Sequence, residues 1–206
     1  MAGPPDSYPL GVAVDVAVGI CVVESFDAID HDLMMRAVRH HSTEPWVLLY
    51  LERWLTAPVQ LPGGTLQSRD RGTPQGGVVS PLLANLFLHD AFDAWMTRSD
   101  PQIPFERYAD DARCHCRSWE AAEDLKAALA RRFADCRLEL HPEKTKIVYC
   151  KDDDRPLDYP ETAFDFLGYT FRPRRSRNRR GKCFINTGRR LKVASWLTLA
   201  GAGYAL

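Results

Sequence analysis

The sequence lacks an uncharged apolar run long enough to cross a lipid bilayer. The apolar-rich stretch over residues 10–23 contains Asp15 and is shorter than the roughly 20 residues that a spanning helix needs. It also lacks the basic residues with which a secretory signal begins. We therefore expect a cytoplasmic protein that has no membrane partner.

Cysteine pairs with metal-ligand spacing are also missing. None of the six cysteines forms a Cys-x-x-Cys pair, so the sequence does not predict a zinc site, and we expect reduced thiols. Likewise, His31, His89 and His141 show no ligand spacing, and we interpret them as structural. The cysteines are Cys21, Cys114, Cys116, Cys136, Cys150 and Cys183.

The 206-residue chain has no excess of either charge, because 27 Lys and Arg residues balance 27 Asp and Glu residues. Affinity for nucleic acid is therefore not visible globally, but one segment near the end is strongly basic. Such a run favours phosphate backbones, although a solvated hairpin is the alternative. The run contains Arg172, Arg174, Arg175, Arg177, Arg179, Arg180 and Lys182.

The most informative motif in the sequence is a pair of adjacent acids in the segment Tyr108-Ala109-Asp110-Asp111. Apolar or β-prone residues flank them at 103–105 and 112–116, which predicts a strand, a tight turn and a second strand. Like charges at a turn repel each other, and a bound Mg²⁺, which prefers oxygen ligands, removes that repulsion. A solvated acidic hairpin tip is the alternative.

A glycine-rich segment precedes the acidic pair, from Arg71 to Gly77. Its proline and three glycines exclude the interior of a helix or central strand, so we expect a loop that approaches a ligand closely. Ser80 and Pro81 then predict the start of a helix, with Ser80 as the cap. The N-terminus of that helix suits a phosphate, and a surface loop before a core helix is the alternative.

The remaining pattern predicts alternating strands and helices, without an internal repeat or a linker that divides the chain. We expect an α+β fold in which helices pack on one face of an antiparallel sheet. The helix over 44–56 should bury an apolar face made by Trp46, Val47, Leu49, Tyr50 and Trp54. We expect a helix that Asp30 or Asp32 caps and that runs through His41. The other expected elements are a strand over 19–24, helices over 44–56, 81–97 and 119–134, a hairpin with the glycine-rich loop over 59–77, and strands over 138–140, 147–150, 164–171 and 183–186.

Five motifs in order resemble the reverse transcriptases of group II introns and related bacterial retroelements, and they span about residues 20 to 186. The motifs are Phe26-Asp27-Ala28-Ile29-Asp30-His31-Asp32-Leu33-Met34, the block from Arg71 to Leu86, Tyr108 to Asp111, Leu140-His141-Pro142-Glu143-Lys144-Thr145-Lys146, and Phe166-Leu167-Gly168-Tyr169-Thr170-Phe171.

This resemblance implies a polymerase palm that extends a DNA primer with deoxynucleoside triphosphates on an RNA template, here intron RNA. Family members hold two metal ions, Mg²⁺ by expectation, with three aspartates. Asp110 and Asp111 match two of them, as catalytic and metal-binding residues. The third position is occupied by Cys21, and a soft thiolate is a poor ligand for hard Mg²⁺. Neither Asp15 nor Glu24 is suitably spaced to replace it.

The resemblance also implies roles for further positions. An ordinary core Phe26 and a solvated Lys144 are the alternatives to two of these roles. Nucleotide or template contacts are expected from Phe26, Arg71, Pro74, Gln75, Gly76, Gly77, Tyr108 and Lys144, primer support from Phe166, Leu167, Gly168 and Tyr169, and backbone contacts from Arg174, Arg175, Arg179 and Arg180.

The palm domain is expected over residues 19–186. Residues 1–18 and 187–206 do not match the family, which continues into fingers and thumb regions, so both ends look truncated relative to it. Three hypotheses follow: an RNA-directed DNA polymerase, a non-catalytic RNA-binding maturase remnant, and a degraded fragment. The intact acidic turn favours the first hypothesis, whereas Cys21 and the unmatched ends favour the other two.

Overall fold

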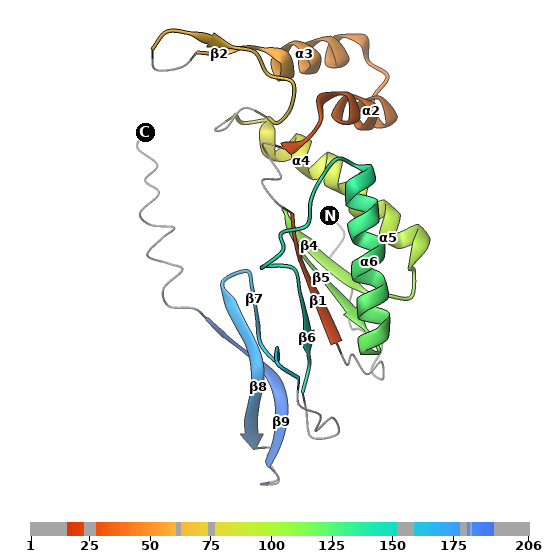
Figure 1. Ribbon diagram of the computed structural model, residues 1–206, viewed down its shortest axis with the longest axis vertical. Helices are drawn as coiled ribbons and strands as arrows, with labels where there is room; N and C mark the ends of the chain where they lie inside the picture. The colour runs from red at the N-terminus through yellow and green to blue at the C-terminus, as the bar shows by residue number, and fades with distance from the viewer. Residues whose placement is uncertain are drawn as a thin grey trace. The chain divides into compact units, whose positions relative to one another are not determined.

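The computed structural model of the chain describes residues 16–22, 28–60, 63–73, 77–151, 159–177, 181 and 183–191. These residues combine helices with antiparallel sheets (Figure 1). They divide into two compact units, of which the first comprises residues 19–114 and 124–146 and the second comprises the other described residues. No described helix is long and apolar enough to cross a membrane.

The larger sheet has the strand order β4-β5-β1-β6. Its strands are β1 (Val16–Cys21), β4 (Phe105–Tyr108), β5 (Asp111–Cys116) and β6 (Lys146–Tyr149). The strand expected over 19–24 begins and ends three residues earlier, at Val16 and Cys21. All six residues of β1 are buried. A strand that is buried on both faces is a continuous apolar run, so alternation in the sequence does not mark its ends. The expected strand over 138–140 is only a bridge between Leu140 and Val22.

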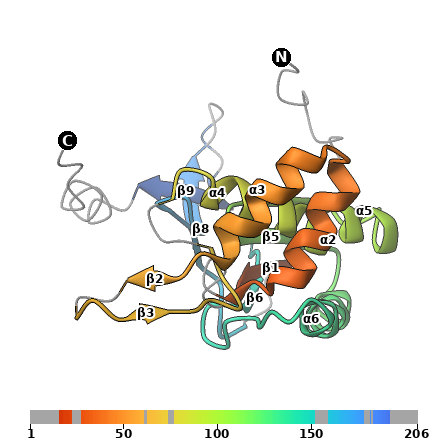
Figure 2. The same cartoon turned by 90° about the horizontal axis from the view of Figure 1, so that it is seen from above.

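Helices cover one face of this sheet, as expected. The predicted helix over 81–97 consists of α4 (Ser80–Leu88), the π-helical turn η1 (His89–Asp93) and α5 (Ala94–Ser99). Phe92 of η1 lies against Phe105 of β4 with 5.2 Å between ring centroids, and it stacks on Phe133 of α6 (Trp119–Asp135) at 6.2 Å. Phe92 thus connects η1 to both strand β4 and helix α6. Figure 2 shows α5 and α6 on one side of β1 and β5.

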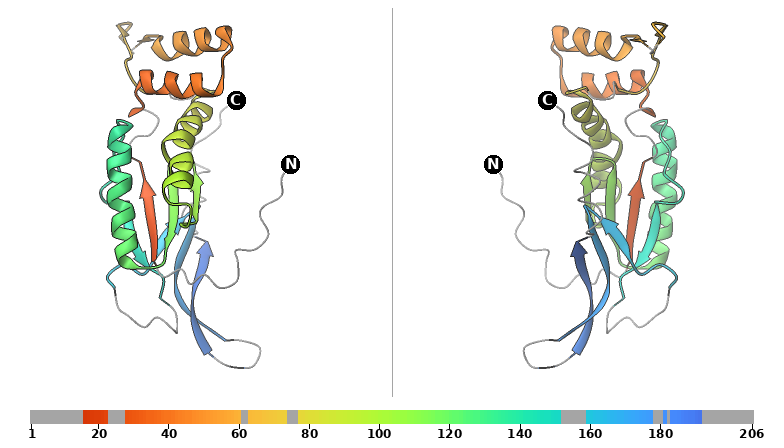
Figure 3. Two further views of the ribbon diagram at one scale, coloured as in Figure 1. Left: turned by 90° about the vertical axis from the view of Figure 1, so that its right-hand side faces the viewer. Right: turned by 90° about the vertical axis from the view of Figure 1, so that its left-hand side faces the viewer.

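Helices α2 (His31–His41) and α3 (Pro45–Thr56) follow each other as a helical hairpin (Figure 3). Asp30 caps α2, because its Oδ1 accepts a hydrogen bond from the Leu33 amide at 3.0 Å. The apolar face predicted for α3 is wrong in part: Trp46 is 62% exposed and Tyr50 is 65% exposed, while Leu55 is buried. Apolar spacing identifies a face but not a covering partner. The predicted hairpin follows as β2 (Val59–Gln60) and β3 (Leu66–Gln67).

The second unit contains a three-stranded antiparallel sheet of β7 (Phe164–Phe166), β8 (Tyr169–Arg177) and β9 (Cys183–Leu191). The single strand predicted over 164–171 is wrong, because a two-residue turn divides it. Leu167 and Gly168 both have positive φ angles, 51° and 77°, as a type I′ hairpin turn requires. Strand β9 continues beyond the predicted Asn186, and Leu191 pairs with Tyr169.

Candidate functional site

The two adjacent acids lie at the turn between β4 and β5, where Tyr108 and Asp111 face each other across the antiparallel pair. Ala109 and Asp110 form the turn itself. Both carboxylates are half-buried, and Tyr108 is 65% exposed. Ala109 has a φ of 53°, in the left-handed region that favours glycine. The turn therefore presents two carboxylates on a strained backbone, which the surrounding structure must hold in place.

Arg107 supplies that support. Its Nε and Nη2 donate hydrogen bonds to the two carboxylate oxygens of Asp93 at 2.7 and 2.6 Å. Its Nη1 donates to Asn85 Oδ1 and to the carbonyl oxygen of Ala109, both at 2.9 Å. The side chain thus clamps the strained turn to η1 and α4. Arg107 is not among the site residues predicted from the sequence, although its spacing of two from Phe105 places both side chains on the helix-covered face.

Cys21 ends β1, the strand beside β5, and it interacts with both acids. Burial of Cys21, together with the negative charges of Asp111 and Asp110, raises the pKa of the thiol to about 11, although Lys144 acts in the opposite direction. A hydrogen bond between Cys21 and Asp111 also favours the protonated thiol. Cys21 is therefore an uncharged group beside two carboxylates at neutral pH.

Thr145 and His141 fix the backbone of Cys21. The amide of Cys21 donates to Thr145 Oγ1 at 3.4 Å, and the same hydroxyl donates to the carbonyl oxygen of Cys21 at 3.3 Å. The His141 amide donates to that carbonyl at 2.8 Å. The motif around Lys144 is thereby brought beside the acidic turn, and the exposed Lys144 is close enough to lower the pKa of Cys21.

The residues at this turn do not fit a complete pair of magnesium ions. Two carboxylates suit a hard cation, but the third donor is a protonated thiol, which is soft and uncharged. Among the residues that the structure describes, ligand atoms of three His, Cys, Asp or Glu side chains converge only at His40, His41 and Asp90. Asp110 and Asp111 therefore offer a partial site for a divalent cation.

The glycine-rich loop is attached to the start of α2. Arg71 and Asp30 form an isolated antiparallel β-bridge through their backbones. The Gly72 amide donates to the carbonyl oxygen of Ile29 at 2.7 Å, and His31 Nε2 lies 2.8 Å from the Gly72 carbonyl oxygen. His31 is thus structural, as expected. Pro74, Gln75 and Gly76 lie outside the described residues, as does Phe26.

The start of α4 differs from the prediction. Ser80 lies inside the first turn and is buried, and Val79 occupies the cap position without a capping side chain. Pro81 lies in the first turn, as predicted, because its missing N–H has no partner to lose there. The Ser80 amide donates instead to the Gly77 carbonyl oxygen at 3.2 Å, which joins the loop to the helix.

In the second unit, the basic segment is mainly part of a strand. Residues 172–177 belong to β8 and pair with β9, although they lie between the strands expected over 164–171 and 183–186. Arg175 is exposed, whereas Arg174 is half-buried, and its Nε and Nη2 have no hydrogen-bond partner. Arg179 and Arg180 lie outside the described residues. Phe166, Leu167, Gly168 and Tyr169 form the β7–β8 turn, at which Leu167 is 50% exposed.

The family described as reverse transcriptase (RNA-dependent DNA polymerase) matches residues 16–171, so the chain belongs to the reverse transcriptase family. Protein YkfC of Escherichia coli strain K12 is 26% identical to it over an alignment of 184 residues. That alignment covers 74% of this chain and 45% of YkfC, so the chain spans less than half of this relative.

Solved telomerase structures are similar in fold. The telomerase of Candida albicans in complex with a TWJ fragment of telomeric RNA has a TM-score of 0.56 and 14% identity, over 75% of this chain and 29% of that one. The apo telomerase of Candida tropicalis truncated from its C-terminal domain has a TM-score of 0.59 and 11% identity, over 76% and 34% of the two chains. At such identities the similarity shows a palm-like fold alone.

Proposed function

We propose that this chain is the palm of an RNA-directed DNA polymerase from a group II intron-type retroelement. The observation that carries the proposal is the pair Asp110 and Asp111 on the β4–β5 turn, in a chain that matches the reverse transcriptase family over residues 16–171. The proposed ligands of this chain are an RNA template, including intron RNA, a DNA primer and deoxynucleoside triphosphates. Asp110 and Asp111 are the proposed catalytic residues and ligands of a divalent cation.

The neighbouring residues suggest how nucleic acid and nucleotide are bound. Tyr108 is exposed beside the acids. Lys144 is also exposed, and its positive charge is close enough to Cys21 to act against the rise in the pKa of that thiol. Arg71 and Gly77 lie at the two described ends of the glycine-rich loop, and Arg71 is exposed. A cationic side chain and an exposed aromatic ring suit phosphate contact and base stacking, respectively.

We further propose that Cys21 impairs polymerase activity. A protonated thiol in place of a carboxylate removes one negative charge and one hard ligand from the site. Removal of one electrostatic group from an active site commonly lowers the rate by about 10²–10³, and loss of a metal ligand should cost at least as much. This same observation favours the second candidate function, RNA binding without catalysis.

Primer extension on an RNA template tests the first candidate function. We expect barely detectable extension by the parent chain and an increase of about 10² or more in Cys21→Asp. The matched control Cys21→Ser changes the thiol without adding a charge and should stay inactive. Adding Asp110→Asn to Cys21→Asp should abolish the gained activity. Robust extension by the parent chain, lost in Asp110→Asn, would show that Cys21 does not impair the enzyme.

RNA binding across salt concentrations tests the second candidate. If four basic residues of the run contact phosphates, log affinity should fall with log salt at a slope of roughly −3 to −4. Changing Arg174, Arg175, Arg179 and Arg180 to Ala should flatten that slope, while Ala at the exposed Arg98 and Arg131 should not. A slope near zero for the parent chain, together with inactivity of Cys21→Asp, would leave neither function supported.

A further inference from the structure

A cluster of metal-ligand side chains lies where the end of α2 meets the π-helical turn η1, away from the acidic turn in the sequence. His40 and His41 are the last two residues of α2, and Asp90 belongs to η1. One ligand atom from each of the three side chains lies within 4.8 Å of the others. His41 Nε2 lies 3.0 and 3.1 Å from the two carboxylate oxygens of Asp90.

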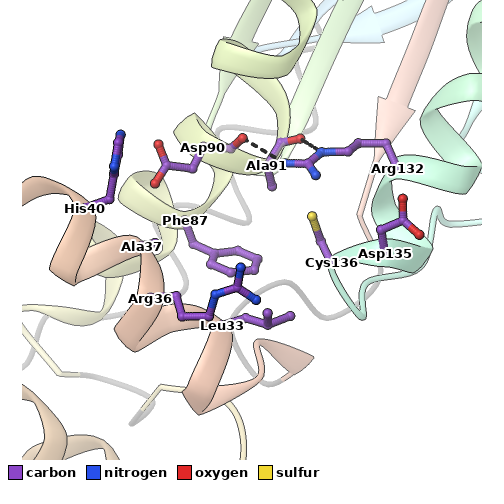
Figure 4. A pocket seen from close by; sticks show the side chains of 10 residues that line it. All are labelled: Leu33, Arg36, Ala37, His40, Phe87, Asp90, Ala91, Arg132, Asp135 and Cys136. Atoms are coloured by element: carbon purple, nitrogen blue, oxygen red, sulfur yellow. Dashed lines mark hydrogen bonds between the residues drawn. The ribbon is translucent and has the colours of Figure 1, made fainter.

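These separations approach those of a coordination shell. Ligand atoms at about 2.0–2.1 Å from a tetrahedral ion are roughly 3.3 Å apart, close to the distances between His41 and Asp90. His40 completes the group, since one ligand atom from each of the three side chains lies within 4.8 Å of the others, and all three side chains are at least partly exposed. In Figure 4 the carboxylate of Asp90 already points toward His40.

The backbone that carries Asp90 is held in position. Arg132 of α6 donates from Nη2 to the Asp90 carbonyl oxygen at 3.1 Å and from Nε to the Ala91 carbonyl oxygen at 3.0 Å. The widened π-helical turn itself is a local irregularity, of a kind that is frequent at functional sites. Asp90 is therefore presented by a fixed main chain, which lowers the cost of ordering the site.

We propose that His40, His41 and Asp90 form a binding site for a divalent transition-metal ion, Zn²⁺ above all. Two imidazoles and one carboxylate are donors that Zn²⁺ accepts, and three protein ligands leave a fourth position for water. Mg²⁺ is disfavoured, because it prefers all-oxygen ligands in octahedral geometry. His40 and Asp90 also line a cavity of about 410 Å³, so two of the three ligands border on open space (Figure 4).

Such an ion links two helices that are far apart in the sequence, because His41 and Asp90 are 49 residues apart. None of its ligands belongs to the acidic turn, so metal binding here can be measured separately from the proposed polymerase function. The alternative is a simple hydrogen-bonded or ionic pair between His41 and Asp90, with His40 nearby by chance. The two cases differ in whether His40 matters for metal affinity.

Co²⁺ titration of the untagged chain, followed by competition with Zn²⁺, tests the site. We expect one Co²⁺ per chain to give visible d–d absorption that is lost in His40→Gln, without thiolate-to-cobalt charge transfer, which separates this ion from one at the acidic turn and from a cysteine site. Zn²⁺ should displace the Co²⁺, excess Mg²⁺ should not, and Zn²⁺ should raise the melting temperature. Because loss of even a supporting partner weakens metal sites about 10–100-fold, His40→Gln, His41→Gln and Asp90→Asn should each weaken binding by at least about tenfold.

His89→Gln is the matched control. The His89 ring lies 6.0 Å from that of His41, but its Nδ1 faces Asp93 at 3.3 Å, so this variant should retain affinity. Circular dichroism of each metal-free variant checks that the exposed substitutions leave the fold intact. No saturable cobalt spectrum, thiolate charge transfer, or unchanged affinity in His40→Gln would overturn the proposal.

Discussion

Replacing Arg107 by Ala should destabilise the protein strongly, because this side chain connects the acidic turn to two helical segments. Arg107 and Asp93 are only 13% and 21% exposed, and their two contacts form a bidentate pair at 2.6 and 2.7 Å. Breaking a fully buried pair costs about 3–5 kcal/mol, whereas an exposed pair contributes about 0–1 kcal/mol. For this degree of burial we expect a loss of about 3 kcal/mol, to which the bonds to Asn85 and Ala109 contribute.

Urea-induced unfolding followed by circular dichroism measures this loss. The midpoint should fall with little change in slope, since the surface exposed on unfolding is similar in both proteins. In a chain of about 200 residues the same loss lowers the melting temperature by roughly 6–12 °C. Arg107→Lys should recover little of the loss, because Lys cannot supply the planar fork. Exposed Arg131→Ala is the control and should change stability by less than about 0.5 kcal/mol.

A loss of less than about 1 kcal/mol in Arg107→Ala would contradict this prediction, since Arg107 and Asp93 would then behave as a solvated surface pair. A double-mutant cycle with Asp93→Asn gives the coupling directly. Coupling near zero would mean that the loss comes from packing of the arginine stem rather than from the ionic contact.

Two further predictions concern the same site. Ala109→Gly should stabilise the chain by about 0.5–1 kcal/mol in the same urea assay, because glycine adopts the observed φ of 53° without strain; a loss of stability would contradict a strained turn. The raised pKa of Cys21 should contribute stability that is complete below the ordinary value of 9.0 and is lost as pH rises through about 11. Iodoacetamide should therefore alkylate exposed Cys183 much faster than Cys21 at pH 8, as read by peptide mass spectrometry, and equal rates would refute the assigned environment.

Local chemistry in the sequence was sufficient for several features. The acidic hairpin follows from β-prone residues around a short turn, and a capping aspartate predicts the start of α2 at Asp30 or Asp32, of which the structure uses Asp30. The position of Cys21 beside the acids was expected from the order of the motifs, and the interactions of its thiol with Asp110 and Asp111 agree with that expectation. These features depend on neighbouring residues or on motifs that the resemblance supplied.

Long-range packing decided the rest. Arg107 meets Asn85 and Asp93 across 22 and 14 residues, and Thr145 holds Cys21 across 124 residues. The exposure of Trp46 and Tyr50 likewise depends on what covers α3, which apolar spacing does not encode. The convergence of His40 and His41 on Asp90 arises because the end of α2 lies against η1. Periodicity and turn residues specify each element by itself, but which side chains meet is set only when the elements pack together.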